Sequence, residues 1–234
     1  MDSNENIETF LYLSNNKFTI NVFSKLNKKI IFKDKLIFDF NQKKFDRDSL
    51  IKFLNKNIFK IEKKFDCFIN YLNLIIDSDN FNYTNISIKK NLDGDILSKK
   101  NQLLLISDLK LEFQNNYNDW ILAHLIINNY LVDNVILEKI DNNIKCQNFS
   151  IEAKFISILK KDLIFYQEIL KQYQITINKI IDGRYIKNFF LNQNLDECEM
   201  GLRILSGANP NEVFFVKKKY KISGFFEKFF KLFS

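Results

Sequence analysis

The chain has 234 residues, of which 46% are hydrophobic and 27% are charged, and its formal net charge is +7. This composition is typical of a globular protein with a real core and excludes a chain that is disordered over most of its length. The three cysteines are far apart, with no CxxC motif and no Cys/His cluster. We therefore expect reduced thiols, and neither a zinc site nor a disulfide framework.

The first eighty residues predict the order β-β-β-α-β. Alternating apolar residues predict two strands around a hairpin turn at 14–16, and a third strand follows. Asp46 is a natural N-cap for a helix whose apolar positions recur at helical spacing as far as about Lys64. A buried strand then returns. The four predicted strands cover 7–13, 17–23, 35–40 and 67–76.

The middle of the chain predicts a strand, a helix, two strands, a helix and a final strand. These elements cover 83–92, 99–115, 120–135, 149–159, 160–172 and 175–182. The first of these strands closes at a turn on Asp93-Gly94. From about Leu191 the pattern weakens; residues 196–205 predict a short helix, and 209–221 have the composition of a tether.

This order predicts one folded unit that is interrupted by another. The frame comprises 1–77 and 173–195, and an inserted subdomain comprises 78–172. A linker of residues 196–222 and a C-terminal helix of residues 223–234 complete the predicted organisation. No run of eighteen apolar residues occurs, so no segment is expected to span a membrane. The acidic N-terminus has no apolar stretch, and we expect no signal peptide.

The last twelve residues, SGFFEKFFKLFS, predict an amphipathic helix. Five phenylalanines recur at i, i+1, i+4, i+5 and i+8, which places them on one helical face. Such a helix is about 16 Å long and cannot cross a bilayer core of about 30 Å, but it can lie in the interface. The alternative, a helix that docks on the protein's own core, remains open. The predicted membrane-binding residues are Phe225, Phe226, Lys228, Phe229, Phe230, Lys231, Leu232 and Phe233.

Much of the positive charge lies beside this helix. From residue 217 onward there are six lysines and one glutamate, so this segment carries +5 of the net +7. Lysines beside an amphipathic helix suit an anionic membrane surface, at about 1 kcal/mol each. A nucleic-acid partner is not expected, because it would favour positive charge on a folded surface. The basic linker lysines are Lys217, Lys218, Lys219 and Lys221.

Three stretches resemble FtsA, the family of bacterial actin-like cell-division proteins that tie the division ring to the membrane. LAHLIINNYLVDN is similar to a family strand at His124, Tyr130 and Asp133. IEAKFISILKKD is similar to another at Ala153, Lys154 and Asp162, and the tail resembles the family's targeting helix. The resemblance implies an α+β fold: an actin-like, ribonuclease H-like half-lobe with an inserted strand-helix-strand-strand subdomain and a C-terminal amphipathic helix.

The same resemblance implies that nucleotide binding has been lost. FLYLSNNK stands where the family has a glycine-rich phosphate loop: Tyr12 replaces an acidic residue, Ser14 replaces a glycine, and Lys17 persists. Phosphate cradles need glycine, because a Cβ blocks close backbone approach. Only about forty residues separate Gly183 from Ser223, which leaves no room for the second lobe. We therefore expect no enzyme activity, cofactor or metal. In the family that lobe supplies the main contact with FtsZ, so whether this chain binds FtsZ is left open.

No other motif points to catalysis. The single histidine, His124, lies in an apolar strand, where a packed core residue is the commoner role. Asp93-Gly94-Asp95 lacks the further oxygen ligands of a calcium loop, so we expect a turn. Lys160-Lys161 is interpreted as a solvated helix start, and Trp120 as a core residue at the start of a strand.

These inferences predict a non-enzymatic adaptor of the bacterial division machinery, bound peripherally to the cytoplasmic face of the inner membrane. Its expected partners are anionic lipid, division proteins and copies of itself, with exposed strands of the inserted subdomain as the contact. One alternative is an actin-like adaptor of pilus assembly or secretion. Another is a nucleotide-dependent ATPase of the actin and sugar-kinase type.

Overall fold

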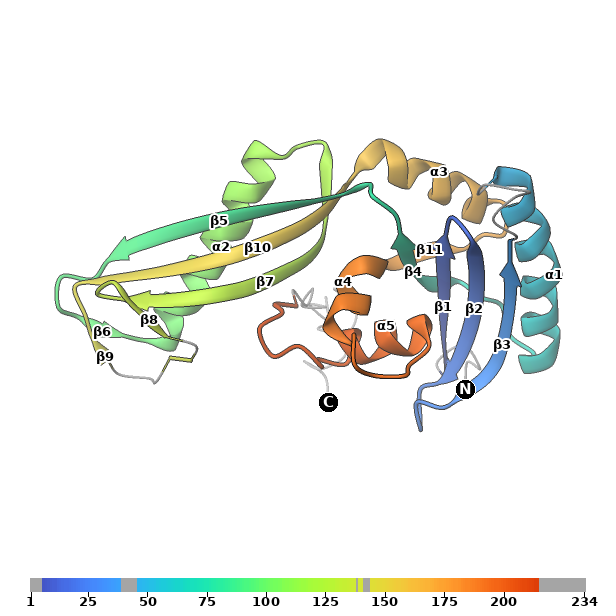
Figure 1. The fold of residues 1–234 in the computed structure, drawn as a ribbon, viewed down its shortest axis with the longest axis horizontal. Helices are drawn as coiled ribbons and strands as arrows, with labels where there is room; N and C mark the ends of the chain where they lie inside the picture. The colour runs from blue at the N-terminus through green and yellow to red at the C-terminus, as the bar shows by residue number, and fades with distance from the viewer. Residues whose placement is uncertain (1–5, 39–45, 138, 141–143, 215–234) are drawn as a thin grey trace, which may run out of the picture.

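The structure is a computed structural model that describes residues 6–38, 46–137, 139–140 and 144–214. Two β-sheets with their helices lie side by side along the long axis of the molecule (Figure 1). The first sheet and its helices comprise β1 (Ile7–Ser14), β2 (Lys17–Ser24), β3 (Ile30–Ile37), β4 (Tyr71–Asp77), β11 (Thr176–Asp182), α1 (Arg47–Phe65), α3 (Lys160–Lys171), α4 (Gly183–Phe189) and α5 (Glu197–Leu205). The second unit comprises β5 (Phe81–Asn91), β6 (Ile96–Leu97), β7 (Trp120–Val132), β8 (Val135–Leu137), β9 (Ile144–Lys145), β10 (Asn148–Leu159) and α2 (Lys99–Asn116).

The strand order of the first sheet confirms the predicted fold class. The order is β11-β4-β1-β2-β3, in which β2 is antiparallel to both of its neighbours, β1 and β3, and β4 and β11 are parallel to β1. This is the actin-like, ribonuclease H-like frame expected from the sequence. The second sheet interrupts it between β4 and β11.

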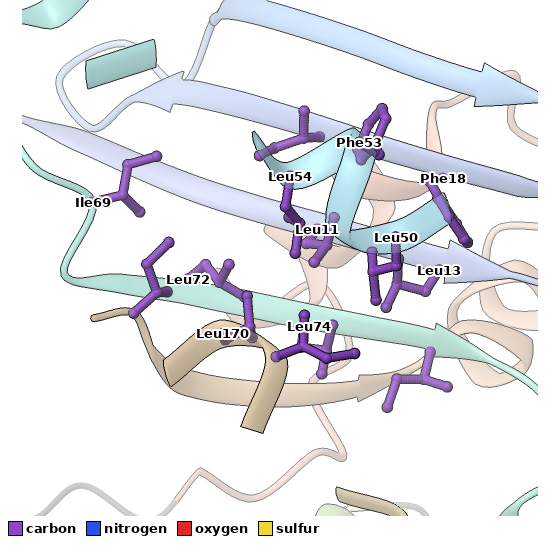
Figure 2. Close-up of a cluster of buried hydrophobic side chains, with 14 of the residues drawn as sticks. Leu11, Leu13, Phe18, Leu50, Phe53, Leu54, Ile69, Leu72, Leu74 and Leu170 are labelled. Atoms are coloured by element: carbon purple, nitrogen blue, oxygen red, sulfur yellow. The ribbon is translucent and has the colours of Figure 1, made fainter. Parts of the chain in front are cut away.

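Helices cover both faces of the first sheet. Successive strand residues point to opposite faces, so Leu11 and Leu13 belong to one core and Phe10 and Tyr12 to another. On the first face, α1 places Leu50, Phe53 and Leu54 over β1 and β4, and Leu170 of α3 packs beside them (Figure 2). On the second face lie α4 and α5. The result is a three-layered frame.

The start and end of α1 follow from its sequence. The Asp46 side chain accepts a hydrogen bond from the Ser49 N–H at 2.6 Å, which is the predicted N-cap. The helix ends where Asp66 adopts a left-handed conformation with φ 49° and its N–H bonds to the Glu62 carbonyl. The predicted helix is confirmed to within one residue of its expected end.

The second sheet has the order β5-β10-β7-β8 and is covered on one face by α2. Alternate residues of β10, from Phe149 to Phe155, point into the core beneath α2. Further along β10, Ile156 and Ile158 join the core of the first sheet instead. One strand therefore contributes to both cores and ties the two sheets together.

Three secondary-structure expectations need correction. The third strand begins at Ile30, earlier than the predicted 35–40, because it pairs with β2 directly after a short turn. The predicted strand 120–135 is a hairpin of β7 and β8, turned at Asp133 and Asn134 with φ 47° and 68°. The helix α4 was not expected.

Two predicted domain boundaries are also wrong in part. Within the predicted insertion 78–172, α3 packs on the frame, because Leu163, Ile169 and Leu170 belong to the core beneath α1. Within the predicted linker 196–222, α5 is folded against the other face of the frame through five buried residues. Residues 215–222 of that linker lie outside the described residues. None of the described helices is both long and apolar enough to cross a bilayer.

Candidate functional site

The end of strand β1 carries the residues that stand where the resemblance places a phosphate loop. Tyr12 lies on the face covered by α4 and α5, is 1% exposed, and donates its hydroxyl to Asp77 Oδ2 at 2.6 Å. Lys187 Nζ lies 2.5 Å from the same carboxylate oxygen. Burial, and then the hydrogen bond to Asp77, raises the pKa of Tyr12 well above its ordinary value. The phenol therefore stays protonated and continues to donate.

Lys17, the one residue that matches the family's loop, is also engaged. Its Nζ lies 2.5 Å from Glu197 Oε1 on α5 and 5.1 Å from the centre of the Tyr12 ring. Both partners of this ion pair are largely buried, with 25% and 15% of the side chains exposed. A phosphate that bound this lysine would lie beside the Glu197 carboxylate, which would repel it.

The turn between β1 and β2 is closed by side-chain bonds. Ser14 Oγ accepts the N–H of Lys17 at 3.1 Å and donates to Asn16 Oδ1 at 2.8 Å. The N–H of Lys17, which could otherwise donate to a phosphate oxygen, therefore already has its acceptor within the turn.

Glycine is used here for packing between elements. A Cβ on Gly183, the first residue of α4, would lie 2.6 Å from the Cβ of Asp77 and 2.9 Å from its Cα. A Cβ on Gly201 of α5 would lie 2.7 Å from Ile75 Cδ1. These two glycines allow α4 and α5 to sit close on β4.

A cavity of about 480 Å³ opens at the ends of β1 and β4, beside the start of α3. Its polar lining includes three aspartates and one lysine, so it offers a phosphate little net attraction. Asp77 is held by Lys187, and Asp79 by Arg184 at 2.6 Å. Within the described ranges, no group of three or more His, Cys, Asp and Glu residues is arranged to hold a metal ion. The aspartates and the lysine of the lining are Asp77, Asp79, Asp162 and Lys161.

His124 forms a joint between the two sheets. It is 2% exposed on β7, and its Nε2 accepts the backbone N–H of Asp182 at 3.0 Å. Because that nitrogen accepts, the ring proton lies on Nδ1, which donates to Glu212 Oε1 at 2.7 Å. Both ring nitrogens are thus used within the protein. The prediction that His124 is a packed core residue is confirmed.

The segment after α5 completes this joint. The N–H of Ile127 bonds to the Asn211 carbonyl at 2.9 Å, and the N–H of Val213 bonds to the Leu125 carbonyl at 2.8 Å. Residues 211–213 thus pair with the edge of β7 that β8 leaves free. Glu212 Oε2 also accepts the Tyr185 hydroxyl at 2.8 Å.

Sequence reasoning missed this joint, because it assigned residues 209–221 to a tether. The local signal was weak: one glutamate precedes Val213 and Phe214 in a polar stretch. Glu212 and His124 are 88 residues apart in the chain, so only the fold brings them together.

The remaining predicted residues fall into two groups. The turn at Asp93-Gly94 is confirmed by positive φ angles of 51° and 88°, Lys160-Lys161 begins α3, and Trp120 packs partly buried at the start of β7. The predicted membrane-binding and basic linker residues lie outside the described residues. They are Lys217, Lys218, Lys219, Lys221, Phe225, Phe226, Lys228, Phe229, Phe230, Lys231, Leu232 and Phe233.

Comparison with known proteins gives similarities of structure. No family model matches the chain, and no curated protein matches it in sequence. One similar solved structure is a PilM–PilN type IV pilus biogenesis complex, with a TM-score of 0.47 and 7% identity over 79% of this chain and 49% of that one. A second is the cytoplasmic domain of EpsL, an inner membrane component of the type II secretion system of Vibrio cholerae, with a TM-score of 0.39 and 11% identity over 77% and 58%.

A third is a Bacteroides thetaiotaomicron protein with an actin-like ATPase fold and unknown function, with a TM-score of 0.32 and 18% identity over 82% of this chain and 58% of that one. This chain thus spans between about half and three fifths of the length of these three proteins. With TM-scores below 0.5 and identities of 18% or less, these likenesses say nothing of what this chain does. The strand order defines an actin-like half-lobe with an inserted second sheet.

Proposed function

We propose that this chain is a non-enzymatic adaptor that is bound peripherally to the cytoplasmic face of the inner membrane. Its C-terminal segment binds anionic lipid, and its folded body binds proteins of the division machinery or further copies of itself. The observation that carries this proposal is the engagement of the phosphate-loop position by the protein's own side chains. Tyr12 is bonded to Asp77, and Lys17 is paired with Glu197.

These contacts argue against a nucleotide-driven mechanism. A bound phosphate would either share Lys17 with the like-charged Glu197 carboxylate or leave that largely buried carboxylate without its partner, and both are costly. The turn also has no glycine to let phosphate oxygens approach the backbone. In addition, the Lys17 N–H already donates to Ser14 Oγ. The body therefore acts as a binding surface.

The tail supplies the proposed membrane affinity. Five phenylalanines on one helical face could bury several hundred Å², which at about 25 cal/mol/Å² gives several kcal/mol before ordering costs. A single anchor of this size holds a protein only marginally. Self-association would raise the affinity through avidity, so we expect membrane binding to be cooperative in protein concentration.

The edge strand β5 is the proposed surface for protein partners. It runs over eleven residues and, among the described elements, pairs only with β10. A long strand edge presents a row of backbone donors and acceptors to a further strand. The same adaptor architecture would also serve pilus assembly or secretion, and the proteins that co-purify with the chain decide between these systems and division.

The test of the anchor is a pair of matched substitutions in the full chain. Phe226→Glu with Phe230→Glu places two carboxylates on the predicted apolar face, whereas Phe226→Leu with Phe230→Leu keeps that face apolar. We expect the glutamate variant to move from the membrane fraction of cells to the supernatant and the leucine variant to remain. Retention of the glutamate variant on membranes would refute the anchor.

A further inference from the structure

The outer face of α1 is rich in lysine beyond its first turn, which holds the exposed Asp48. Between residues 52 and 64, the exposed positions hold five lysines, one asparagine and one phenylalanine, and no carboxylate. Their spacing follows the helix, so they share one face, opposite the side that packs on the sheet. We call this surface the α1 lysine face. Its members are Lys52, Asn55, Lys56, Phe59, Lys60, Lys63 and Lys64.

Within the described parts of the chain, most of this charge is not neutralised. Lys56 pairs with Asp34 at 2.9 Å, and Lys64 donates to the Ile31 carbonyl at 2.7 Å. No ion pair among those residues involves Lys52, Lys60 or Lys63. Of the acidic residues of the helix, Glu62 accepts the N–H of Ile69 at 3.1 Å, and Asp48 is exposed one turn before Lys52.

The arrangement is unfavourable for an isolated helix. Lys52 and Lys56, Lys56 and Lys60, and Lys60 and Lys64 are like charges four residues apart, and each such pair is slightly destabilising. A partner that bears negative charge would relieve this repulsion.

A large apolar side chain stands in the middle of these lysines. Phe59 is 67% exposed, and Phe68, just beyond the helix, is 73% exposed. A single exposed phenylalanine is ordinary. Phe59 stands among lysines of which only Lys56 is paired with a carboxylate. Such a surface has the composition of one that meets the headgroup region of a bilayer, where the ring enters and the ammonium groups stay at the phosphates.

We propose that the α1 lysine face is a second membrane-contact surface that binds anionic lipid headgroups independently of the C-terminal segment. This inference rests on the proposed function at a membrane and deepens it. Because α1 forms one end of the molecule and the second sheet forms the other (Figure 1), contact through α1 turns the edge of β5 away from the bilayer. The strand edge proposed for partners would then face the cytoplasm.

Lipid is favoured over nucleic acid by the shape of the surface. Single-stranded nucleic acid is held in charged grooves where several aromatic rings stack on successive bases. The α1 lysine face is the convex side of one helix and carries one aromatic ring, Phe59. A planar anionic surface can contact all of its lysines at once.

The test measures binding of the full chain to vesicles made of equal amounts of phosphatidylcholine and phosphatidylglycerol, with phosphatidylcholine vesicles as the neutral reference. The face variant carries Lys52→Gln, Lys60→Gln and Lys63→Gln, which keep good helix formers at exposed positions. The matched control carries Lys89→Gln, Lys99→Gln and Lys100→Gln, which remove the same charge from exposed positions in the second unit. Equal urea midpoints establish that both variants fold.

We expect the face variant to bind the anionic vesicles about a hundredfold more weakly at low salt, at about fivefold per lysine. The control should remain within about threefold of the unaltered chain, since its lysines belong to the second unit, at the other end of the molecule from α1 (Figure 1). Equal weakening in the face variant and the control would overturn the proposal. So would unchanged vesicle binding combined with loss of binding to a fluorescent oligonucleotide.

The same series in a chain that also carries Phe226→Glu and Phe230→Glu separates this inference from the proposed anchor. If those tail substitutions leave binding unchanged, the anchor fails, and the comparison of face variant with control still decides the second surface. If the tail substitutions weaken binding while face variant and control behave alike, the anchor stands and the second surface fails.

Discussion

His124 Nδ1 and Glu212 Oε1 lie 2.7 Å apart, and both side chains are almost fully buried between the two sheets. The histidine belongs to the inserted sheet, whereas the glutamate follows the last helix of the frame. The contact therefore fixes how the insertion sits on the frame. It also anchors the chain immediately before the C-terminal segment begins.

Replacing Glu212 should separate the polar role of this contact from its shape. Glu212→Ala leaves the Nδ1–H of His124 and the Tyr185 hydroxyl buried without their acceptor, and we expect it to lower the free energy of unfolding by about 3–5 kcal/mol. Glu212→Gln keeps a carbonyl oxygen for His124 and should cost less than half as much. Urea unfolding measures both, and equal losses would show that the acceptor is unimportant.

Nucleotide should not stabilise the protein. A ligand present at a hundred times its dissociation constant adds about 2.7 kcal/mol to stability, which raises Tm by about 5–11 °C for a chain of this size. Because Lys17 and Tyr12 are engaged within the protein, we expect ATP with magnesium to give the same Tm as magnesium alone. A shift of that size, abolished by Lys17→Met, would show that the loop still binds phosphate.

The two packing glycines should respond differently to alanine. At Gly183 the new Cβ meets the backbone of Asp77, which cannot move aside, so we expect a loss of about 1–3 kcal/mol. At Gly201 it meets the side-chain ends of Ile75 at 2.7 Å and Ile181 at 3.4 Å, which are flexible, and the gain in helix propensity offsets part of the strain. Thermal or urea unfolding should rank Gly183→Ala as the less stable variant; the reverse order would contradict the close approach of α4 to β4.

Stability should depend on pH through Asp182. Burial raises the pKa of this carboxyl above its ordinary 3.8, against the opposing hydrogen bonds from Tyr83 and the Arg184 amide. Below pH 3.8 the Asp182 carboxyl is protonated in both the folded and the unfolded state, and its contribution to stability is complete. That contribution is lost as the pH rises through the folded-state pKa.

Asp182→Asn removes this titration. We expect the variant to gain stability relative to the unaltered chain as the pH rises from about 4 to 7, with the other carboxyl groups cancelling in the difference. Urea unfolding across that range measures the difference. A difference that stays constant with pH would show that burial does not perturb this carboxyl.

The frame could be predicted because its signals are local. Aromatic residues and leucine alternate along the second half of β1, Asp46 caps α1, and the apolar residues of α1 repeat at helical spacing. Turn residues with positive φ, such as Asp93 and Gly94, could also be assigned from residue type alone. These features depend on neighbours within a few positions.

The features that were missed depend on residues far apart in the chain. The placement of α3 on the frame is set by contacts with α1, and the pairing of residues 211–213 with β7 is set by a free strand edge. The α1 lysine face was not predicted, because the charge was summed over the whole body of the chain. A body that is nearly neutral in total can still carry a helix with positive charge on one face. The packing of Leu50, Phe53 and Leu54 on the sheet shows which side of α1 is exposed (Figure 2).

The most direct test of the central claim is co-sedimentation with anionic vesicles, comparing the full chain with one that ends at Ile222. The account predicts that the full chain pellets with the vesicles and that salt weakens this binding, because lysines and phospholipid headgroups attract each other. It predicts a marked loss of pelleting for the shortened chain. Any binding that remains should depend on the α1 lysine face. Equal pelleting of the two chains, or none by either, would contradict the proposed membrane anchor.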